Sequence, residues 1–199
     1  MRELVYYVAV SLDGYIAGPG GEFDAFLFEG DHMSALNERF ADAIPTHIAD
    51  ALAIRGDGSM FDSVVMGWNT YAVGLPDATS PYRHLRQVVF SRTRSAADIP
   101  GEHPNLTVTD EDPVDLVRRL KAEPGTSIWL CGGGSLAAVL RDEIDRLVLK
   151  RNPVVFGDGI PLFTPGGPVT YDPQRFDEVE TTAYGSGVVV SEYVRRHSS

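Results

Sequence analysis

The sequence lacks several features that would each define a class of protein. It has a single cysteine, Cys131, so an intrachain disulfide framework and a cysteine-rich zinc site are both excluded. No apolar run approaches the roughly 18 residues of a membrane-spanning helix. Residues 1–20 do not show the basic segment, apolar segment and cleavage pattern of a secretory signal peptide. We therefore expect a cytoplasmic protein with no membrane partner.

Positive charge is also scarce. The 199 residues carry a formal net charge of −11 at pH 7, and the pI is near 4.8. A nucleic-acid-binding surface requires a basic excess, so we expect no nucleic-acid partner. A small anionic ligand held locally by arginines and backbone amides is compatible with this charge. The length and the 43% hydrophobic content suit one domain, which we expect over residues 1–199.

What the sequence does contain is a series of short apolar runs separated by segments with helical spacing. Such runs are typical of strands buried on both faces of a sheet. They lie at residues 4–10, 63–66, 87–90 and 128–131, and two further strands are expected, a short edge-like one at residues 106–108 and an alternating, partly exposed one at residues 144–151. Helical spacing appears over residues 33–54, with a break at Pro45, and over residues 112–122.

The C-terminal region has a different pattern. Residues 176–183 and 188–194 flank Gly185-Ser186-Gly187, which is a strong hairpin signal. Strands separated by helices predict a mostly parallel sheet with helices on both faces. The expected fold class is therefore α/β, with three layers (αβα) and a mostly parallel central sheet closed by a C-terminal antiparallel hairpin.

The segment SIWLCGGGSLAAVLRD, residues 127–142, organises the rest of the chain. Its residues predict a buried strand, a glycine turn and a helix. Gly132–Gly134 let the backbone approach a ligand with no Cβ in the way. A helix that begins just after the turn offers unpaired N–H groups to an anion. The segment suits a phosphate cradle, and a tight turn without a ligand is the alternative.

Two other predicted strands end in groups that suit a phosphate. Gly67 ends the strand at residues 63–66, and Thr70 lies where a following helix would begin. The motif SRTR, residues 91–94, follows the strand at residues 87–90. Hydroxyls beside a fork-shaped cation suit a phosphate monoester, with a plain basic loop as the alternative.

The first strand leads into SLDGYIA, residues 11–17, and then into the glycine-rich loop at residues 18–21. Ligands of open α/β sheets gather at the carboxyl ends of the strands, so this loop is a candidate lid or pocket wall. Asp24 follows between Phe23 and Phe26. We expect Asp24 to be either a proton donor or a solvated loop acid, and Asp13 to shape the loop.

Taken in order, these motifs resemble the dihydrofolate reductase superfamily. The closer likeness is to stand-alone bacterial proteins related to the reductase domain of the bifunctional riboflavin-biosynthesis deaminase/reductase. The likeness runs nearly end to end, through VAVSLDGYIA, VVMGWNTY, VVFSRT, IWLCGGGSLAAVL and IDRLVLKRNPVVFGDGIPLF. It implies a dihydrofolate-reductase-like fold. It also implies an NADPH-dependent reductase that transfers a hydride to a small pterin- or pyrimidine-like heterocycle.

Carried over by position, the resemblance implies an NADPH site without a metal. The turn at Gly67 would hold the pyrophosphate side, Arg92 would meet the adenosine 2′-phosphate, and Ala9 would border the nicotinamide. The implied cofactor contacts are Ala9, Ile16, Gly67, Asn69, Thr70, Ser91, Arg92, Thr93, Cys131, Gly132, Gly133, Gly134, Ser135 and Leu136. Asp24 and Asp13 are the candidate catalytic residues.

The chain also departs from the family pattern. Trp68 and Asn69 stand where relatives commonly have Arg or Lys, so NADPH affinity and its preference over NADH would depend on Arg92 and Arg94. Tyr15 stands where the riboflavin enzymes usually have Lys. A zinc deaminase half needs a His/Cys/Cys set that this sequence does not contain.

Two alternatives come from other classes. Gly132-x-Gly134-x-x-Ala137 fits the loose Rossmann fingerprint, but it lies two-thirds along the chain, and Asn152 stands where an acid is expected. The second alternative is a non-catalytic nucleotide-binding or ligand-sensing module on the same scaffold. Relatives are often dimers, and Val188 and Val190 suggest a sheet edge able to pair. We therefore expect a homodimer.

Overall fold

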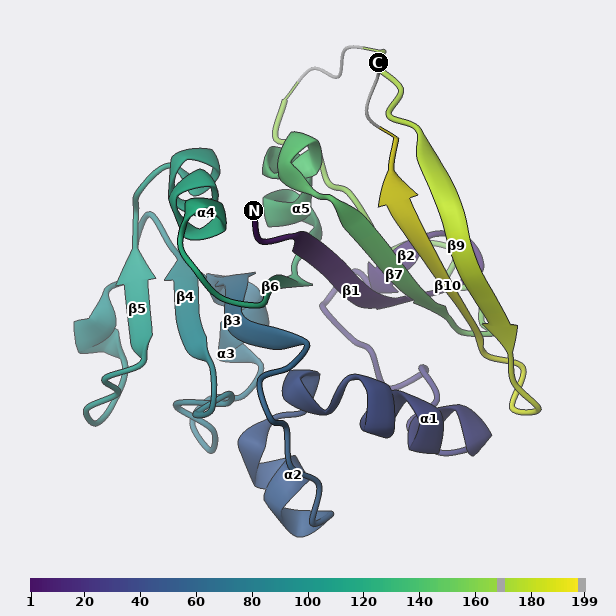
Figure 1. Ribbon diagram of the computed structural model, residues 1–199, viewed down its shortest axis with the longest axis horizontal. Helices are drawn as coiled ribbons and strands as arrows, with labels where there is room; N and C mark the ends of the chain where they lie inside the picture. Colours follow the sequence, from purple (N-terminus) through teal and green to yellow (C-terminus); the bar gives the residue numbers. More distant parts are fainter. Residues whose placement is uncertain (168–170, 197–199) are drawn as a thin grey trace.

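The apolar runs assemble into one eight-stranded sheet in the computed structural model, which describes residues 1–167 and 171–196 (Figure 1). The strand order is β5-β4-β3-β6-β1-β7-β10-β9. The strands are β1 (Leu4–Val10), β3 (Phe61–Gly67), β4 (Arg86–Phe90), β5 (Leu106–Thr109), β6 (Ser127–Gly132), β7 (Arg146–Arg151), β9 (Phe176–Ala183) and β10 (Val189–Arg195). Pairs from β5 to β7 are parallel, whereas β10 is antiparallel to β7 and to β9. The predicted parallel sheet and C-terminal hairpin are confirmed.

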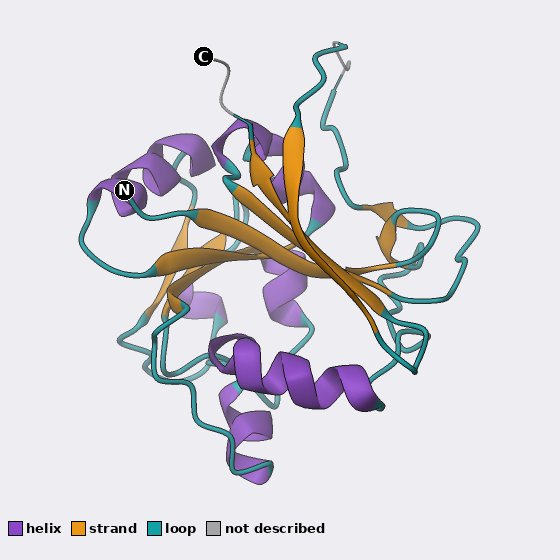
Figure 2. Cartoon of the chain, turned by 45° about the vertical axis from the view of Figure 1, so that its right-hand side comes forward, coloured by secondary structure: helices purple, strands orange, loops and turns teal. Residues whose placement is uncertain are grey.

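Helices cover both faces of the sheet, which gives the three predicted layers (Figures 1 and 2). On one side lie α1 (Asp31–Arg39), α2 (Thr46–Ala51) and α3 (Trp68–Ala72), and on the other lie α4 (Pro113–Ala122) and α5 (Gly134–Val139). Leu36 of α1 and Tyr71 of α3 pack in one core, and Val117 of α4 packs in the other. Burial of these apolar faces against the sheet is the main force that holds the layers together.

The sequence of α4 shows why this helix begins where its spacing predicts. The Asp112 carboxylate accepts hydrogen bonds from Val114 N and Asp115 N, and Pro113 occupies the first helical position. Both features satisfy or remove N–H groups that a helix start leaves unpaired. Leu116, Val117 and Leu120 then face the sheet.

The helical segment predicted over residues 33–54 is shorter and more divided than its spacing indicates. α1 ends at Arg39, a 3-10 turn covers Ala41–Ala43, and α2 begins only after Pro45. The buried carboxylate of Asp42 explains the early end, because it accepts hydrogen bonds from the backbone N–H groups of Gly58, Met60 and Phe61. These bonds tie the turn to the start of β3 rather than to another turn of helix.

A second, two-stranded sheet replaces what the sequence indicates as loops. β2 (Tyr15–Ala17) pairs antiparallel with β8 (Ile160–Pro161). Gly159 makes this pairing possible, since its φ is +159° and an added Cβ would lie 2.2 Å from the carbonyl oxygen of Ala17. The first loop and the loop after β7 are therefore one structural unit.

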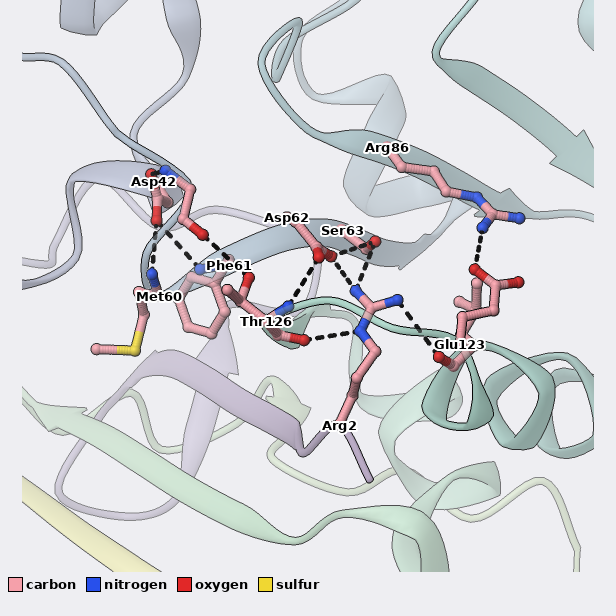
Figure 3. A network of polar contacts seen from close by, with 11 residues as sticks. Arg2, Asp42, Met60, Phe61, Asp62, Ser63, Arg86, Glu123 and Thr126 are labelled. Carbon is pink, nitrogen blue, oxygen red and sulfur yellow. Dashed lines mark hydrogen bonds and ion pairs between the residues drawn. The ribbon is translucent and has the colours of Figure 1, made fainter.

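A polar network fastens the chain near the start of β1 (Figure 3). The buried Arg2 donates from Nε to the Thr126 carbonyl at 2.7 Å and also bonds Ser63 Oγ at 2.9 Å. Its guanidinium forms an ion pair with Asp62, which in turn accepts from Thr126 N at 2.8 Å. This network lies at the amino ends of β1, β3 and β6, opposite to the turns that follow β3, β4 and β6.

Val188 and Val190 correct one sequence-based expectation. The sequence suggests that they form a surface edge, but their exposed fractions are 0% and 6%, because both pack in the core beneath α1. The free edge of the sheet on that side is β9, and the homodimer stays a prediction. The predicted single domain over residues 1–199 includes residues 168–170 and 197–199, which lie outside the described residues.

Within the described ranges, no helix has the length and apolar character that crossing a membrane demands. No group of three or more His, Cys, Asp or Glu side chains in those ranges is arranged to hold a metal ion.

Candidate functional site

The three turns that the sequence predicts as phosphate-binding lie side by side, at the carboxyl ends of neighbouring strands. β4, β3 and β6 are neighbours in the strand order, and all three are parallel (Figure 1). Gly67 is the register partner of Phe90, and Met66 is the register partner of Gly132. Since adjacent strands are about 4.8 Å apart, the turns that follow them form one continuous surface. The structure thus brings together the three strand ends that the sequence singled out.

The turn after β6 needs glycine for its own geometry. Gly132 has a φ of +132°, a conformation that L side chains rarely adopt, and the Gly132–Gly133 peptide bond is cis. A Cβ on Gly133 would lie 3.3 Å from Thr70 Oγ1. The hydroxyl of Thr70, at the start of α3, therefore sits directly beside the glycine turn.

Gly67 is different, because nothing in the described part of the chain requires a glycine there. Its φ of −77° and ψ of 159° are open to any residue, and no atom of the described residues lies within 4 Å of the place that a Cβ would take. An absent side chain with free space around it suits a position that another molecule approaches closely. The turn at Gly67 therefore fits a phosphate-bearing cofactor.

The SRTR turn after β4 carries the local positive charge. Ser91 Oγ accepts from Thr93 N at 3.3 Å and from Arg94 N at 2.9 Å, which closes the turn. Arg94 is engaged, with its guanidinium 5.7 Å from the Trp68 ring centre and 3.5 Å from Asp98. Arg92 is exposed and, within the part of the chain that the structure describes, pairs with no carboxylate. Arg92 is therefore the cation available to a ligand.

The rest of the glycine segment is placed less favourably for direct contacts. Ser135 is exposed, but Leu136 is buried in the core beneath α5, so only its backbone could face a ligand. α5 has only six residues, which limits the helix dipole that the sequence predicts at this turn. Burial raises the pKa of Cys131 to about 12, so this cysteine is a thiol rather than a thiolate.

Asp13 connects the first loop to the loop after β7. Its carboxylate accepts from Ser11 Oγ at 2.6 Å, from Gly157 N at 2.8 Å and from Phe156 N at 3.1 Å. The Ser11 hydroxyl is the largest cause that lowers the pKa of Asp13 to about 2, and the two backbone N–H groups add to it. Asp13 is thus an ionised carboxylate whose acceptor capacity is committed to the loops.

The remaining predicted residues lie on β1, β2, α3 and the segment between β2 and α1. Ala9 is half-buried on β1 and Ile16 half-buried on β2, whereas Asn69 is exposed on α3. Asp24 is exposed, although its neighbour Phe26 is buried and stacks on Phe156 with ring centres 5.1 Å apart. The role of Asp24 as a proton donor stays a prediction.

A buried polar cluster was not anticipated from the sequence. Asn152 Oδ1 accepts from Leu27 N at 3.0 Å, and Asn152 Nδ2 donates to the Lys150 carbonyl at 3.1 Å. The fully buried His32 lies with Nε2 3.2 Å from the Leu27 carbonyl and Nδ1 3.0 Å from Ser186 Oγ. The only sequence signal was polar residues in or beside apolar segments, which more often indicates exposure.

Two cavities, of about 140 and 280 Å³, flank α1. Arg39 and Glu192 line both of them, and neither contains a residue predicted to bind cofactor. Arg39 and Arg146 both pair with Glu192, so the charges at these cavities are already matched within the protein.

A three-layer αβα sandwich with a C-terminal antiparallel hairpin and glycine turns at neighbouring strand ends defines a dihydrofolate-reductase-like α/β protein. The chain belongs to the RibD C-terminal domain family, whose model matches residues 2–190. It is similar to two uncharacterised proteins of Bacillus subtilis (strain 168). YwjB is 34% identical over 166 residues, which cover 81% of this chain and 83% of YwjB. YyaP is 29% identical over 204 residues, with coverages of 94% and 92%.

Solved structures share the fold. A putative riboflavin biosynthesis protein from Shewanella sp. PV-4 superposes with a TM-score of 0.70 at 24% identity, covering 99% of this chain and 100% of that chain. RibD of Acinetobacter baumannii gives 0.65 at 13% identity, with coverages of 98% and 58%. A deaminase/5-amino-6-(5-phosphoribosylamino)uracil reductase from Thermotoga maritima gives 0.61 at 15%, with coverages of 98% and 57%. The chain therefore spans a little over half of these two longer proteins. The family predicted from the sequence motifs is confirmed.

Proposed function

We propose that this protein is an NADPH-dependent reductase that transfers a hydride to a small pterin- or pyrimidine-like heterocycle. The observation that carries the proposal is that Gly67, Arg92 and Gly132 all lie at the carboxyl ends of the neighbouring strands β3, β4 and β6. The turns supply backbone amides, hydroxyls and one available guanidinium, which are the groups that bind a phosphorylated dinucleotide. Membership of the RibD C-terminal domain family supports the same reaction class.

The residues would divide the work by position. Gly67, Thr70 and Gly132 would hold the pyrophosphate side, and Arg92 would bind the 2′-phosphate. When bound, the cofactor supplies the hydride that adds to the carbon of a C=N bond, while a proton from solvent or Asp24 reaches the nitrogen. Ala9 and Ile16 would border the reacting ring and exclude water from it. The part of the protein is therefore to orient two ligands.

Arg92→Ala tests this assignment through the difference between two cofactors. NADPH carries the 2′-phosphate and NADH does not, so the substitution should weaken NADPH binding about tenfold and leave NADH unchanged. Quenching of Trp68 fluorescence, next to Gly67, provides the titration. Arg55→Ala is the matched control, since Arg55 is another exposed arginine but precedes β3 at its opposite end. Equal losses for the two cofactors would show that Arg92 is misassigned.

One observation favours the second candidate, a nucleotide-binding or ligand-sensing module without turnover. A reductase of this kind needs a proton for the substrate nitrogen, but the nearby acids Asp13, Asp24 and Asp31 are all exposed. Asp13 and Asp31 also already accept backbone hydrogen bonds. A protein that binds NADPH but does not oxidise it with any member of a panel of pterins and aminopyrimidines is such a module. Loss of the NADPH absorbance with any one of them, above a protein-free blank, establishes the reductase.

A further inference from the structure

Lysine is almost absent from this protein. Only two of the 17 Lys and Arg residues are lysines, Lys121 and Lys150, and both are buried. Lys121 is neutralised inside the protein, because its Nζ lies 2.6 Å from Asp145 and donates to the Glu143 carbonyl at 2.7 Å. Lys150 has no such partner: among the residues the structure describes, no carboxylate lies within the 4.0 Å of an ion pair. The two lysines are thus a matched pair with opposite electrostatic situations.

The contacts of Lys150 are weak ones. Its ammonium lies 3.5 Å from the Leu27 carbonyl oxygen and 5.6 Å from the ring centre of Phe28. The same carbonyl is closer to His32, at 3.2 Å, so it does not serve Lys150 alone. An ammonium has three donors, and a contact of 3.5 Å is at the limit of a hydrogen bond. Burial lowers the pKa of Lys150, as expected for a cation without a counter-charge.

The position of Lys150 places it near the part of the proposed site where the substrate would meet the nicotinamide. It is the register partner of Ala9 on β1 and of Val190 on β10. Register partners share a face of the sheet, and Val190 packs in the core on the α1 side, so Ala9 and Lys150 both face α1. Ala9 is the residue expected to border the nicotinamide, and a substrate that receives the hydride must lie against the nicotinamide. Lys150 is therefore close to the place where such a substrate would bind.

We propose that Lys150 is a substrate-binding residue whose ammonium pairs with an anionic oxygen, of a carboxylate or a phosphate, carried by the heterocycle. The proposal rests on the proposed function, because it assigns the substrate class of the same site. A buried ammonium without a counter-charge costs free energy, and a ligand anion supplies the missing charge. Lysine presents its charge as a compact ammonium with three donors, which can pair with a single anionic oxygen without the planar two-pronged geometry of arginine.

The two lysines allow a direct test by NMR. Protein labelled with ¹³C,¹⁵N-lysine gives two side-chain signals, which Lys121→Arg and Lys150→Arg assign. The probes are pterin-6-carboxylate, pterin and inorganic phosphate, each at millimolar concentration with and without NADPH. We expect pterin-6-carboxylate or phosphate to shift the Lys150 signal and raise its titration midpoint, while Lys121 stays unchanged and pterin has little effect. The probe that acts identifies the carboxylate or the phosphate, and no Lys150 response to either anion overturns the proposal.

Lys150→Met separates a binding role from a structural one. Removal of an uncompensated buried charge should raise Tm by about 2–4 °C and weaken the effective anionic probe about tenfold or more, with NADPH affinity unchanged. Lys121→Met, which breaks a compensated pair, should lower Tm. A lower Tm for Lys150→Met with undiminished probe affinity would assign Lys150 a structural role and overturn the proposal. Failure of NADPH to bind the unmodified protein contradicts the proposed function instead, and the Lys150 signal is read without NADPH in that case.

Discussion

The missing side chain at Gly67 is a residue-scale probe of the proposed cofactor edge. The Gly67→Ala variant should fold normally, and its free energy of unfolding should rise by up to about 0.5 kcal/mol. The reason is that alanine is permitted in this backbone conformation and lowers the conformational entropy of the unfolded chain. The new methyl group should keep the pyrophosphate away from the backbone and weaken NADPH binding about tenfold. Thermal unfolding and a fluorescence titration measure the two effects.

Gly166→Ala is the control for this substitution. Gly166 is exposed and, like Gly67, has no described atom within 4 Å of an added Cβ, but it lies in the loop after β8. The control should leave NADPH affinity unchanged. If Gly67→Ala binds NADPH as tightly as Gly166→Ala does, the cofactor does not approach this turn.

Asp13 gives a pH-dependent prediction at the same scale. Its pKa is lowered from 3.8 to about 2, chiefly by the Ser11 hydroxyl, so the fold favours the ionised form. The stability that Asp13 contributes is therefore fully present above pH 3.8 and is lost as the pH falls towards 2. Asp13→Asn should lower Tm relative to the unmodified protein above pH 4, with a difference that shrinks between about pH 4 and pH 2. A difference that is constant from pH 6 to pH 2 would contradict this.

The glycine turns could be predicted from the sequence, because glycines directly after an apolar strand indicate a sharp turn or a close backbone approach. The sequence contains no comparable signal for Lys150, His32 or Asn152. A lysine in a strand ordinarily indicates an exposed face, but this one is buried and lies beside the distant segment that carries Leu27 and Phe28. Burial of a polar residue depends on which distant segment lies over it, and that information is not local.

At the scale of elements, the pairing of β2 with β8 connects the first loop to the loop after β7. Gly159→Ala should destabilise the protein by about 2 kcal/mol, because a Cβ would meet the Ala17 carbonyl at 2.2 Å in a backbone conformation that disfavours side chains. It should also weaken NADPH binding, since Ile16 belongs to β2. Urea unfolding measures the first effect, with Gly166→Ala as the control again. An unchanged midpoint would show that the pair is not a structural requirement.

The long apolar runs could be predicted as strands because their composition is typical of buried sheet. β2 and β8 could not, since three and two residues are too few to show a periodicity. The loops that they join are held by contacts such as that of Asp13 with Gly157, 144 residues apart. The end of α1 was missed for a similar reason, because Asp42 bonds to backbone groups of residues 58–61.

At the scale of the whole molecule, cofactor binding should appear as stability. A ligand that binds only the folded state adds about 2.7 kcal/mol at a hundredfold excess over its Kd. For a chain of 199 residues this corresponds to a rise in Tm of about 5–10 °C. Differential scanning fluorimetry should show the rise with NADPH and a smaller one with NADH at equal concentration. No rise with either nucleotide at millimolar concentration would contradict the proposed function.

The strand order has a consequence for how the protein is made. Among the strands of the sheet β1 is translated before all the others, yet it lies between β6 and β7, and its Tyr7 carbonyl accepts a hydrogen bond from Trp129, 122 residues later. This apolar strand of the nascent chain therefore leaves the ribosome before its partner strands exist. It stays exposed until β6 and β7 have been made, which makes this segment a natural place for a chaperone to act.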